Sequence, residues 1–478
     1  MKPPEPPQQL SDKEIREKKK RSLKYSVMDG AFYSAMVGFG ESFLSAFAVF
    51  LQATTFQLGL LGSLPQTLGS IVELFSTRLI RFFRSRKKFV FIGAYLQGLM
   101  YIPVALVFFF GTFKVFHLIL FVCLYWIFGM IVSPAWSSWM GDLIDEKDKG
   151  TYFGRRNRIA GVVTFVAFLL GGYILQNFSA SRMVQYYGFA IIFGLAFISR
   201  IFSIIYLAKQ HEPEYAPAKG AEFTFIDFLK QARFRNYGLF VLFFTTMNFF
   251  VYLSGPFFTP YMLNDLKFSY MTFTIVNAVS LIVKYLAMPA WGKAADRYGT
   301  RKVLSLASFM MPLVPLLWVF STNLWYLLIV QIYSGIAWAG FELMSFSFIF
   351  DTTTPQKRAT CVAYYNVLNG IMIFVGAMLG TAVVKYLPVA FFFSQYYLVF
   401  ILSFAGRYLI SIYFIPKLKE VKQVDHISYD KLFMQIISAM PTMGLMHRII
   451  MVEADGLNKI EHKVADEVKK IKNGKFKI

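Results

Sequence analysis

Long apolar runs alternate with short polar breaks along most of the 478 residues. A hydrocarbon core about 30 Å thick needs roughly 20 apolar residues for each helical crossing. The chain has twelve runs of this kind, six in each half, and they predict an all-α integral membrane protein with twelve transmembrane helices. The predicted spans are 25–51, 57–82, 89–112, 116–141, 156–177, 184–207, 237–262, 269–292, 302–320, 324–350, 360–385 and 392–416.

The two halves share a sequence pattern at a nearly constant offset. Three residues of the first half recur 209 positions later, and an arginine recurs in the similar strings FISRIFSIIYL and FAGRYLISIYF. The matched pairs are Asp142 with Asp351, Asn157 with Asn366, Gly161 with Gly370, and Arg200 with Arg407. Repeats of this kind are typical of transporters with a binding site between duplicated halves. We therefore expect two pseudo-symmetric six-helix bundles.

The predicted bundles are residues 25–208 and 237–417, with a basic tail at 1–24, a linker at 209–236 and a charged tail at 418–478. Within the linker, FTFIDFLKQARFRN has the amphipathic pattern of a helix lying in the membrane interface, although a solvated connector fits the same residues. Residues 432–452 contain a proline and two basic residues. We interpret them as two short interfacial helices rather than as a thirteenth span.

Composition and charge agree with a membrane protein and indicate its orientation. Hydrophobic residues make up 56% of the chain and charged residues 16%, yet the net charge is +22. The basic residues gather in alternate breaks, so the positive-inside rule places both termini in the cytoplasm and the protein in the plasma or inner cell membrane. This alternation also argues against a nucleic-acid partner, and we expect a monomer in the lipid bilayer.

No enzyme chemistry is indicated by the sequence. The chain has two cysteines and five histidines, and the histidines lie at the edges of the predicted spans or in the tails. We find no metal-spaced cluster, nucleophile motif or pair of catalytic carboxylates. The sequence therefore predicts no metal, no cofactor and no catalytic residue.

The break after the eighth span reads WGKAADRYGTRKV and resembles the signature loop of the major facilitator superfamily. The residues that match the signature are Gly292, Asp296, Arg297, Gly299, Arg301 and Lys302. With the duplicated six-helix pattern, the resemblance covers residues 25 to 416. It implies a secondary active transporter that moves a small solute by alternating access. The sequence markers of the drug/proton antiporters and of the sugar porters are missing, so the resemblance does not identify the substrate. We interpret the chain as a member of a prokaryotic-type subfamily.

The resemblance also implies a lock between the bundles at the cytoplasmic side. The corresponding loop of the first half, TRLIRFFRSRKKF, departs from the signature, so we expect the second copy to act alone. A carboxylate is stabilised by a helix N-terminus, and arginine adds charge-assisted hydrogen bonds. We expect Asp296 to bind the start of the fifth helix near Arg155 and Arg156.

Charged side chains inside the spans are the candidate coupling groups, since each costs roughly 2.5–3.5 kcal/mol at the bilayer centre. Glu41 lies about 22 Å along the first span and Glu342 about 13 Å from the end of the tenth. In the family these two helices line the central cavity, one from each bundle. We predict that Glu41 carries the proton and that Glu342 with Lys284 orients the substrate. A structural role for each acid, and a structural Lys284–Glu342 ion pair, remain the alternatives.

Polar residues on other spans form a candidate cavity lining, although each could also make an ordinary hydrogen bond between helices. The predicted lining is Gln66, Asn248, Tyr252, Asn277, Lys284, Gln331, Glu342, Asn366 and Asn369. We expect Glu73 to form an interfacial salt bridge with Arg78. Arg200 and Arg407 lie near the ends of peripheral helices, and we expect both to reach the lipid headgroups.

A proton-coupled permease is therefore the leading hypothesis. Two alternatives keep the same fold: a lipid flippase or scramblase, for which the basic loops would gather anionic headgroups, and a membrane receptor that transports nothing. The sequence identifies neither the substrate nor the direction of transport.

Overall fold

The computed structural model describes residues 12–145, 149–213, 236–352, 355–387, 393–420, 425 and 427–438. The first residues of the basic tail, the expected interfacial helix of the linker and most of the charged tail lie outside this part of the chain. Their predicted structures therefore stay predictions.

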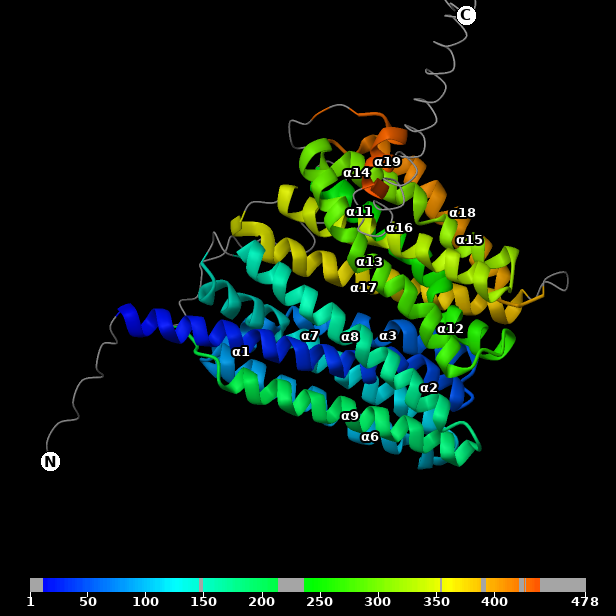
Figure 1. Cartoon of the computed structure of the whole chain (residues 1–478), viewed down its shortest axis with the longest axis horizontal. Helices are drawn as coiled ribbons and strands as arrows, with labels where there is room; N and C mark the ends of the chain where they lie inside the picture. Colours follow the sequence, from blue (N-terminus) through cyan, green and yellow to red (C-terminus); the bar gives the residue numbers. More distant parts are fainter. Residues whose placement is uncertain are drawn as a thin grey trace, which may run out of the picture.

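The first bundle contains the helices that follow the first six apolar runs (Figure 1). They are α1 (Asp12–Phe39), α2 (Leu44–Phe50), α3 (Thr55–Glu73), α4 (Ser76–Phe83), α5 (Arg86–Leu99), α6 (Tyr101–Leu106), α7 (Lys114–Leu143), α8 (Lys149–Asn177) and α9 (Arg182–Ala208). Several expected spans are divided into two consecutive helices. The first helix begins at Asp12, well before the expected start at residue 25, because it continues into the basic tail.

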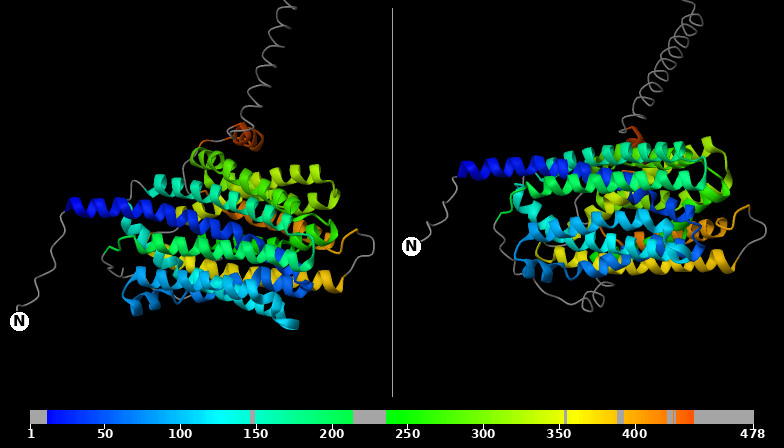
Figure 2. Two further views of the ribbon diagram at one scale, coloured as in Figure 1. Left: turned by 60° about the horizontal axis from the view of Figure 1, so that its bottom comes forward. Right: turned by 90° about the horizontal axis from the view of Figure 1, so that it is seen from below.

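The second bundle repeats this arrangement above the first in Figure 1, and the long helices run nearly parallel in all views (Figure 2). It contains α11 (Asn236–Ser254), α12 (Phe258–Pro260), α13 (Tyr270–Tyr298), α14 (Thr300–Met310), α15 (Leu313–Phe320), α16 (Leu324–Thr352), α17 (Pro355–Tyr386) and α18 (Tyr397–Phe414). A short helix, α19 (Tyr429–Ser438), follows and packs on α13.

Eleven helical segments within the described residues are long and apolar enough to cross a membrane. The expected span at 57–82 is the exception. It forms α3 and α4, and α3 carries Ser63, Gln66, Thr67 and Ser70 on its sides. These polar residues lower its mean hydropathy. They are tolerated because α3 packs inside the protein, where Ser63, Thr67 and Ser70 are buried and Gln66 is partly buried. The twelve-helix architecture expected from the sequence is confirmed.

The first crossing is broken next to its buried acid. α1 ends at Phe39, and a 3-10 turn at Glu41–Phe43 separates it from α2. Gly40 lies directly against the ring of Tyr101, where a Cβ atom would overlap with that ring. The close approach of α6 therefore requires glycine at this break, and the break sets the direction of the Glu41 side chain.

The two bundles meet along two pairs of helices, α3 with α17 and α8 with α13. At the first contact, the Thr67 hydroxyl donates to the Gly370 carbonyl oxygen at 2.7 Å. Gly370 is one of the repeated positions, and its missing side chain lets α17 approach Thr67 and Ser70. This duplicated position thus lies at the seam between the halves.

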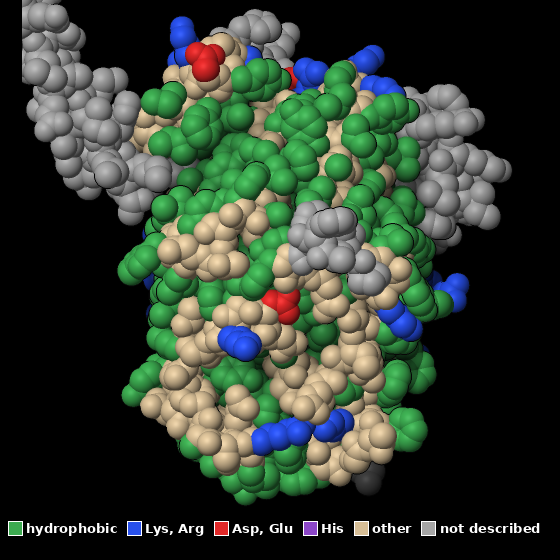
Figure 3. Space-filling view, turned by 90° about the vertical axis from the view of Figure 1, so that its right-hand side faces the viewer, with side chains coloured by type: hydrophobic (Ala, Val, Ile, Leu, Met, Phe, Trp, Pro, Cys, Tyr) green, Lys and Arg blue, Asp and Glu red, His purple; other side chains and the backbone are tan. Residues whose placement is uncertain are grey.

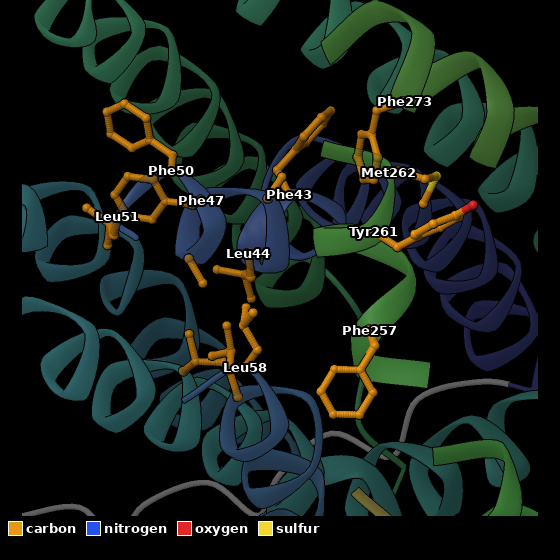
Figure 4. Close-up of a cluster of buried hydrophobic side chains, with 14 of the residues drawn as sticks. Phe43, Leu44, Phe47, Phe50, Leu51, Leu58, Phe257, Tyr261, Met262 and Phe273 are labelled. Atoms are coloured by element: carbon orange, nitrogen blue, oxygen red, sulfur yellow. The ribbon is translucent and has the colours of Figure 1, made fainter. Parts of the chain in front are cut away.

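The apolar core differs between the two ends of the protein. We call the end that carries the loops at 84–86 and 298–300 the basic end. At the opposite end, one apolar cluster joins both bundles, with Phe43 and Leu44 from the first and Phe257 and Tyr261 from the second (Figure 4). Toward the basic end, each bundle has its own cluster.

The surface of this opposite end agrees with the charge pattern of the sequence. Its side chains are mostly hydrophobic or uncharged polar groups (Figure 3). Few charged side chains are visible on this face, which agrees with the expected placement of the basic breaks at the other end (Figure 3). The sidedness of the membrane itself stays a prediction.

Candidate functional site

A cavity of about 640 Å³ lies between the bundles and is the candidate substrate site. Most of its wall comes from the second bundle, and the first bundle contributes Ser45, Gly62 and Gln66. Eight of the nine predicted lining residues are found there: Gln66, Asn248, Tyr252, Asn277, Lys284, Gln331, Glu342 and Asn369. Trp318, Trp338 and Phe258 add aromatic surface that the sequence pattern did not single out.

Lys284 and Glu342 face this cavity as an ion pair. The Lys284 Nζ atom lies 3.1 Å from the Glu342 carboxylate, joining α13 to α16. The Lys284 side chain is 20% exposed and that of Glu342 is 43% exposed. The pair is therefore open to a ligand in the cavity, so the geometry allows both roles that the sequence left open.

Amide and hydroxyl groups cross-link the cavity wall. The Asn248 amide donates to the Asn369 Oδ1 atom at 2.6 Å, which joins α11 to α17. The Tyr252 hydroxyl donates to the Gln66 Oε1 atom at 3.0 Å, a contact between the two bundles. Any solute that binds these groups replaces hydrogen bonds that hold the wall together. Binding is thereby linked to the relative position of the bundles.

Glu41 lines a different cavity, which corrects the expectation that it faces the central one. This second cavity has a volume of about 320 Å³, and all of its lining residues belong to the first bundle. The Tyr125 hydroxyl of α7 donates to the Glu41 Oε2 atom at 2.9 Å. Glu41 lies in the 3-10 turn that follows Gly40, so the direction of its side chain does not follow from the helical periodicity of α1.

The second cavity also contains a charged network that the sequence analysis missed. The Ser203 hydroxyl donates to Asp29 Oδ1 at 2.6 Å and accepts from the Arg200 Nη1 atom at 3.0 Å. Arg156 lies 4.0 Å from Asp29 and stacks over the Trp136 ring. Asp29 is a carboxylate within the first predicted span, and this signal was available in the sequence.

Arg200 does not reach the lipid headgroups, contrary to our expectation. Its side chain is buried, with 6% of the residue exposed. Besides Ser203, it donates to Gln97 Oε1 at 2.7 Å and to the Ala94 carbonyl oxygen at 3.3 Å, and it lies over the Tyr33 ring. These partners on neighbouring helices hold the guanidinium inside the bundle more effectively than lipid contact would.

Arg407 is buried as well, so the headgroup interpretation is wrong for both repeated arginines. It is 2% exposed and donates to the Ser254 hydroxyl at 3.1 Å and the Val251 carbonyl oxygen at 3.4 Å. Its Nη1 atom also lies 3.7 Å from the Met311 sulfur atom. Arg407 is among the residues that line the central cavity.

Glu73 binds a residue of the other bundle instead of Arg78. The Asn366 amide donates to its Oε2 atom at 3.2 Å, whereas the Arg78 guanidinium lies over the Phe75 ring. Asn366 is the predicted lining residue that is not found in the cavity wall. The expected Glu73–Arg78 bridge fails because α3 ends at Glu73 and the chain turns before α4.

The signature loop binds the chain that follows α18. The Arg301 backbone N–H donates to Glu420 at 2.8 Å, the Arg297 side chain pairs with Asp425 at 3.4 Å, and the Lys302 ammonium donates to the Ile427 carbonyl oxygen. Gly299 has a φ of 91°, a conformation that favours glycine. These contacts hold the chain that follows α18 against the loop between α13 and α14.

In the first bundle, the chain that follows α9 makes similar contacts with the loop between α4 and α5. Glu212 accepts hydrogen bonds from the Ser85 hydroxyl and from the backbone N–H groups of Arg86 and Lys87. A carboxylate at the N-terminus of α5 is electrostatically favourable. The two halves thus share this arrangement. Glu212, after α9, binds the N-terminus of α5, and Glu420, after α18, binds the N-terminus of α14.

The expected lock between the bundles is not formed in this conformation. Asp296 and Arg155 are exposed, and Asp296 makes no ion pair with Arg155 or Arg156 in the described part of the chain. Arg156 instead donates to the Ser26 carbonyl oxygen and approaches Asp29. The lock stays a prediction for a conformation in which the basic end is closed.

Comparison with known proteins agrees with this architecture. Three solved structures show the same fold, each with a TM-score near 0.6. The D-xylose-proton symporter has a TM-score of 0.66 and 12% identity, over 85% of this chain and 99% of that one. The nucleoside transporter NupG has a TM-score of 0.61 and 16% identity, over 84% and 99%. A bacterial homologue of the iron transporter ferroportin has a TM-score of 0.60 and 11% identity, over 85% and 99%.

Sequence comparison identifies the family. The class B tetracycline resistance protein of Escherichia coli is 31% identical over 108 residues, which are 23% of this chain and 27% of that protein. The model of the Major Facilitator Superfamily matches residues 30–258 and 238–443, which cover most of the chain. With duplicated bundles, a central cavity and a match of this extent, the chain belongs to the Major Facilitator Superfamily.

Proposed function

We propose that the protein is a secondary active transporter that moves a small solute through the central cavity by alternating access. The observation that carries this proposal is the polar cavity between two repeated bundles, with the Lys284–Glu342 pair open to it. Groups of both bundles meet across it, as in the Tyr252–Gln66 hydrogen bond. A solute bound there would act on both halves.

The unequal ends of the core support the alternating movement. The bundles share one apolar cluster at the end opposite the basic loops and have separate clusters toward the basic end. In our proposal, transport separates the shared cluster and brings the basic ends together. Asp296 then binds the start of α8, which supplies an attractive contact for the second state.

Proton coupling is the finer part of the proposal. Glu41 takes the proton inside the first bundle, where burial in a medium of low dielectric disfavours the charged carboxylate. Its hydrogen bond with Tyr125 ties its protonation to α7. Glu342 with Lys284 orients the solute in the central cavity. The protein acts as a monomer in the cell membrane with both termini in the cytoplasm, as the basic loops indicate.

Uptake into proteoliposomes tests this function. Purified protein is reconstituted, and entry of a panel of labelled organic acids, sugars, nucleosides and amino acids is measured with and without an inward proton gradient. We expect one class of solute to accumulate only in vesicles that contain the protein, and to accumulate further with the gradient. Transfer of fluorescent lipids between leaflets, with no solute entry, would instead support the flippase alternative.

A further inference from the structure

Arg407 is a buried cation for which the described part of the chain supplies no carboxylate. Its hydrogen-bond acceptors are the Ser254 hydroxyl and the Val251 carbonyl oxygen, both neutral. Its Nε atom is buried and has no hydrogen-bond partner. A buried charge is normally paired, because the loss of hydration is otherwise uncompensated.

The charged side chains that line the central cavity do not neutralise Arg407. Among the described residues, three charged side chains line this cavity: Lys284, Arg407 and Glu342. Lys284 and Glu342 pair with each other at 3.1 Å. Two cations against one carboxylate leave the wall with a formal excess of one positive charge, and that excess belongs to Arg407.

The repeat provides an internal comparison. Arg200 occupies the corresponding place in the first half, and Ser203 links it to Asp29. The first-bundle cavity is lined by Asp29 and Glu41 together with Arg156 and Arg200, so its formal charges cancel. In the first half, nearby carboxylates therefore balance the charge of the buried arginine. In the described part of the second half, no carboxylate is linked to Arg407 in this way.

We propose that the central cavity takes an organic anion with a single negative charge, and that Arg407 supplies the attraction for its charged group. This inference rests on the proposed transport function and names its substrate class. A cleft walled by low-dielectric protein concentrates the field of its charges, which raises the local concentration of the opposite ion. The aromatic side chains of Trp318, Trp338 and Tyr252 suit the apolar body of such a solute.

A cysteine placed in the wall can report the electrostatic potential without knowledge of the substrate. Gly255 lines the cavity, follows the Ser254 that binds Arg407, and has open space where a Cβ atom would be. The native Cys123 and Cys361 are replaced by serine, and Gly255→Cys is introduced into the full chain. The thiol is then modified by sulfonatoethyl and trimethylammonioethyl methanethiosulfonate, which carry opposite charges. Each rate is normalised to that of a free thiol.

We expect the normalised rate of the anionic reagent to exceed that of the cationic reagent by about tenfold or more, because the Arg407 charge attracts one reagent and repels the other. Arg407→Gln should remove most of this preference and Arg407→Lys should keep it. Arg158→Gln, which removes an exposed arginine outside both cavities, is the matched control and should leave it unchanged. Glu342→Gln should increase the preference for the anionic reagent, because it removes the negative charge that faces the cavity. This variant tests the inference with Arg407 intact.

The possible results separate this inference from the proposed function. Equal normalised rates for the two reagents, or a preference unchanged by both Arg407→Gln and Glu342→Gln, would overturn the anion assignment and leave transport standing. Failure of both reagents to reach the thiol from both sides of the membrane would overturn the transport function and this inference together.

Discussion

The two cavities of this protein use a repeated arginine in different ways. In the first bundle, Arg200 belongs to a network with Asp29, Ser203 and Gln97, and the charges lining the cavity balance. In the second bundle, Arg407 binds neutral groups only and contributes to the cavity between the halves. The duplicated fold has thus kept the position of a buried cation while its electrostatic surroundings have diverged.

We expect this difference to correspond to different functions of the two halves. Two carboxylates and two arginines line the cavity of the first bundle, and in our proposal Glu41 there takes up and releases the proton. The second bundle supplies most of the wall of the central cavity, including its ion pair and most of its amides. We therefore expect substitutions in the first cavity to affect coupling and stability, and substitutions in the central cavity to affect binding.

Glu41→Gln should have the largest effect on transport. The amide cannot release a proton, so gradient-driven accumulation should disappear while binding and exchange of solute remain near the wild-type level. Glu73→Gln is the matched control, because Glu73 binds Asn366 outside both cavities. Accumulation by proteoliposomes measures the effect. Full proton-driven accumulation by the Glu41→Gln protein would return Glu41 to a structural role.

Arg200→Leu should destabilise the protein far more than Arg407→Leu. Removing one member of a buried charge network costs about 3–5 kcal/mol, because its partner remains buried and unpaired. Arg407→Leu removes a cation that has no buried carboxylate partner, so we expect a loss of about 1–2 kcal/mol from its hydrogen bonds. Denaturant unfolding of the purified protein compares the two. Equal losses would show that the two arginines have equivalent surroundings.

Lys284→Gln should weaken solute binding roughly tenfold to hundredfold while sparing stability. A hydrogen bond to a charged group contributes about 1.5–3 kcal/mol, and the partner that remains, the Glu342 side chain, is 43% exposed, so the substitution leaves little buried charge. The dissociation constant of the transported solute, measured by calorimetry, reports the change. An unaltered constant would mean that the Lys284–Glu342 pair only joins α13 to α16.

Asp296→Asn should have the smallest effect, a severalfold shift between conformations. The substitution removes the charge that favours the N-terminus of α8 when the basic ends meet, an interaction of about 0.3–1 kcal/mol. Distances between spin labels across the basic end measure the populations. The lock would be refuted if these populations did not change.

The fold was predictable from the sequence because its signals are local and repeated. Runs of apolar residues fix the crossings, and basic breaks fix their alternation, so the bundle architecture follows from pattern alone. The signature loop could be placed for the same reason. Its partners could not, because Glu420 and Asp425 follow α18, far along the chain from the loop.

The candidate site was predictable only where helical periodicity holds. Eight of the predicted residues lie along one cavity because α3, α11, α13, α16 and α17 present their polar faces to it. Glu41 was assigned to the wrong cavity because the turn at Gly40 interrupts the periodicity. Arg200 and Arg407 were misplaced because the distance of a residue from a helix end does not reveal buried acceptors on neighbouring helices.

Paired distance measurements test the central claim of alternating access most directly. In a background without Cys123 and Cys361, spin labels are placed at Arg158 and Lys293 across the basic end, and at Ser179 and Thr322 across the opposite end; all four positions are exposed. We predict two distances for each pair, with the longer distance at one end accompanying the shorter distance at the other as pH and solute are varied. A single distance at both ends under all conditions would contradict the account.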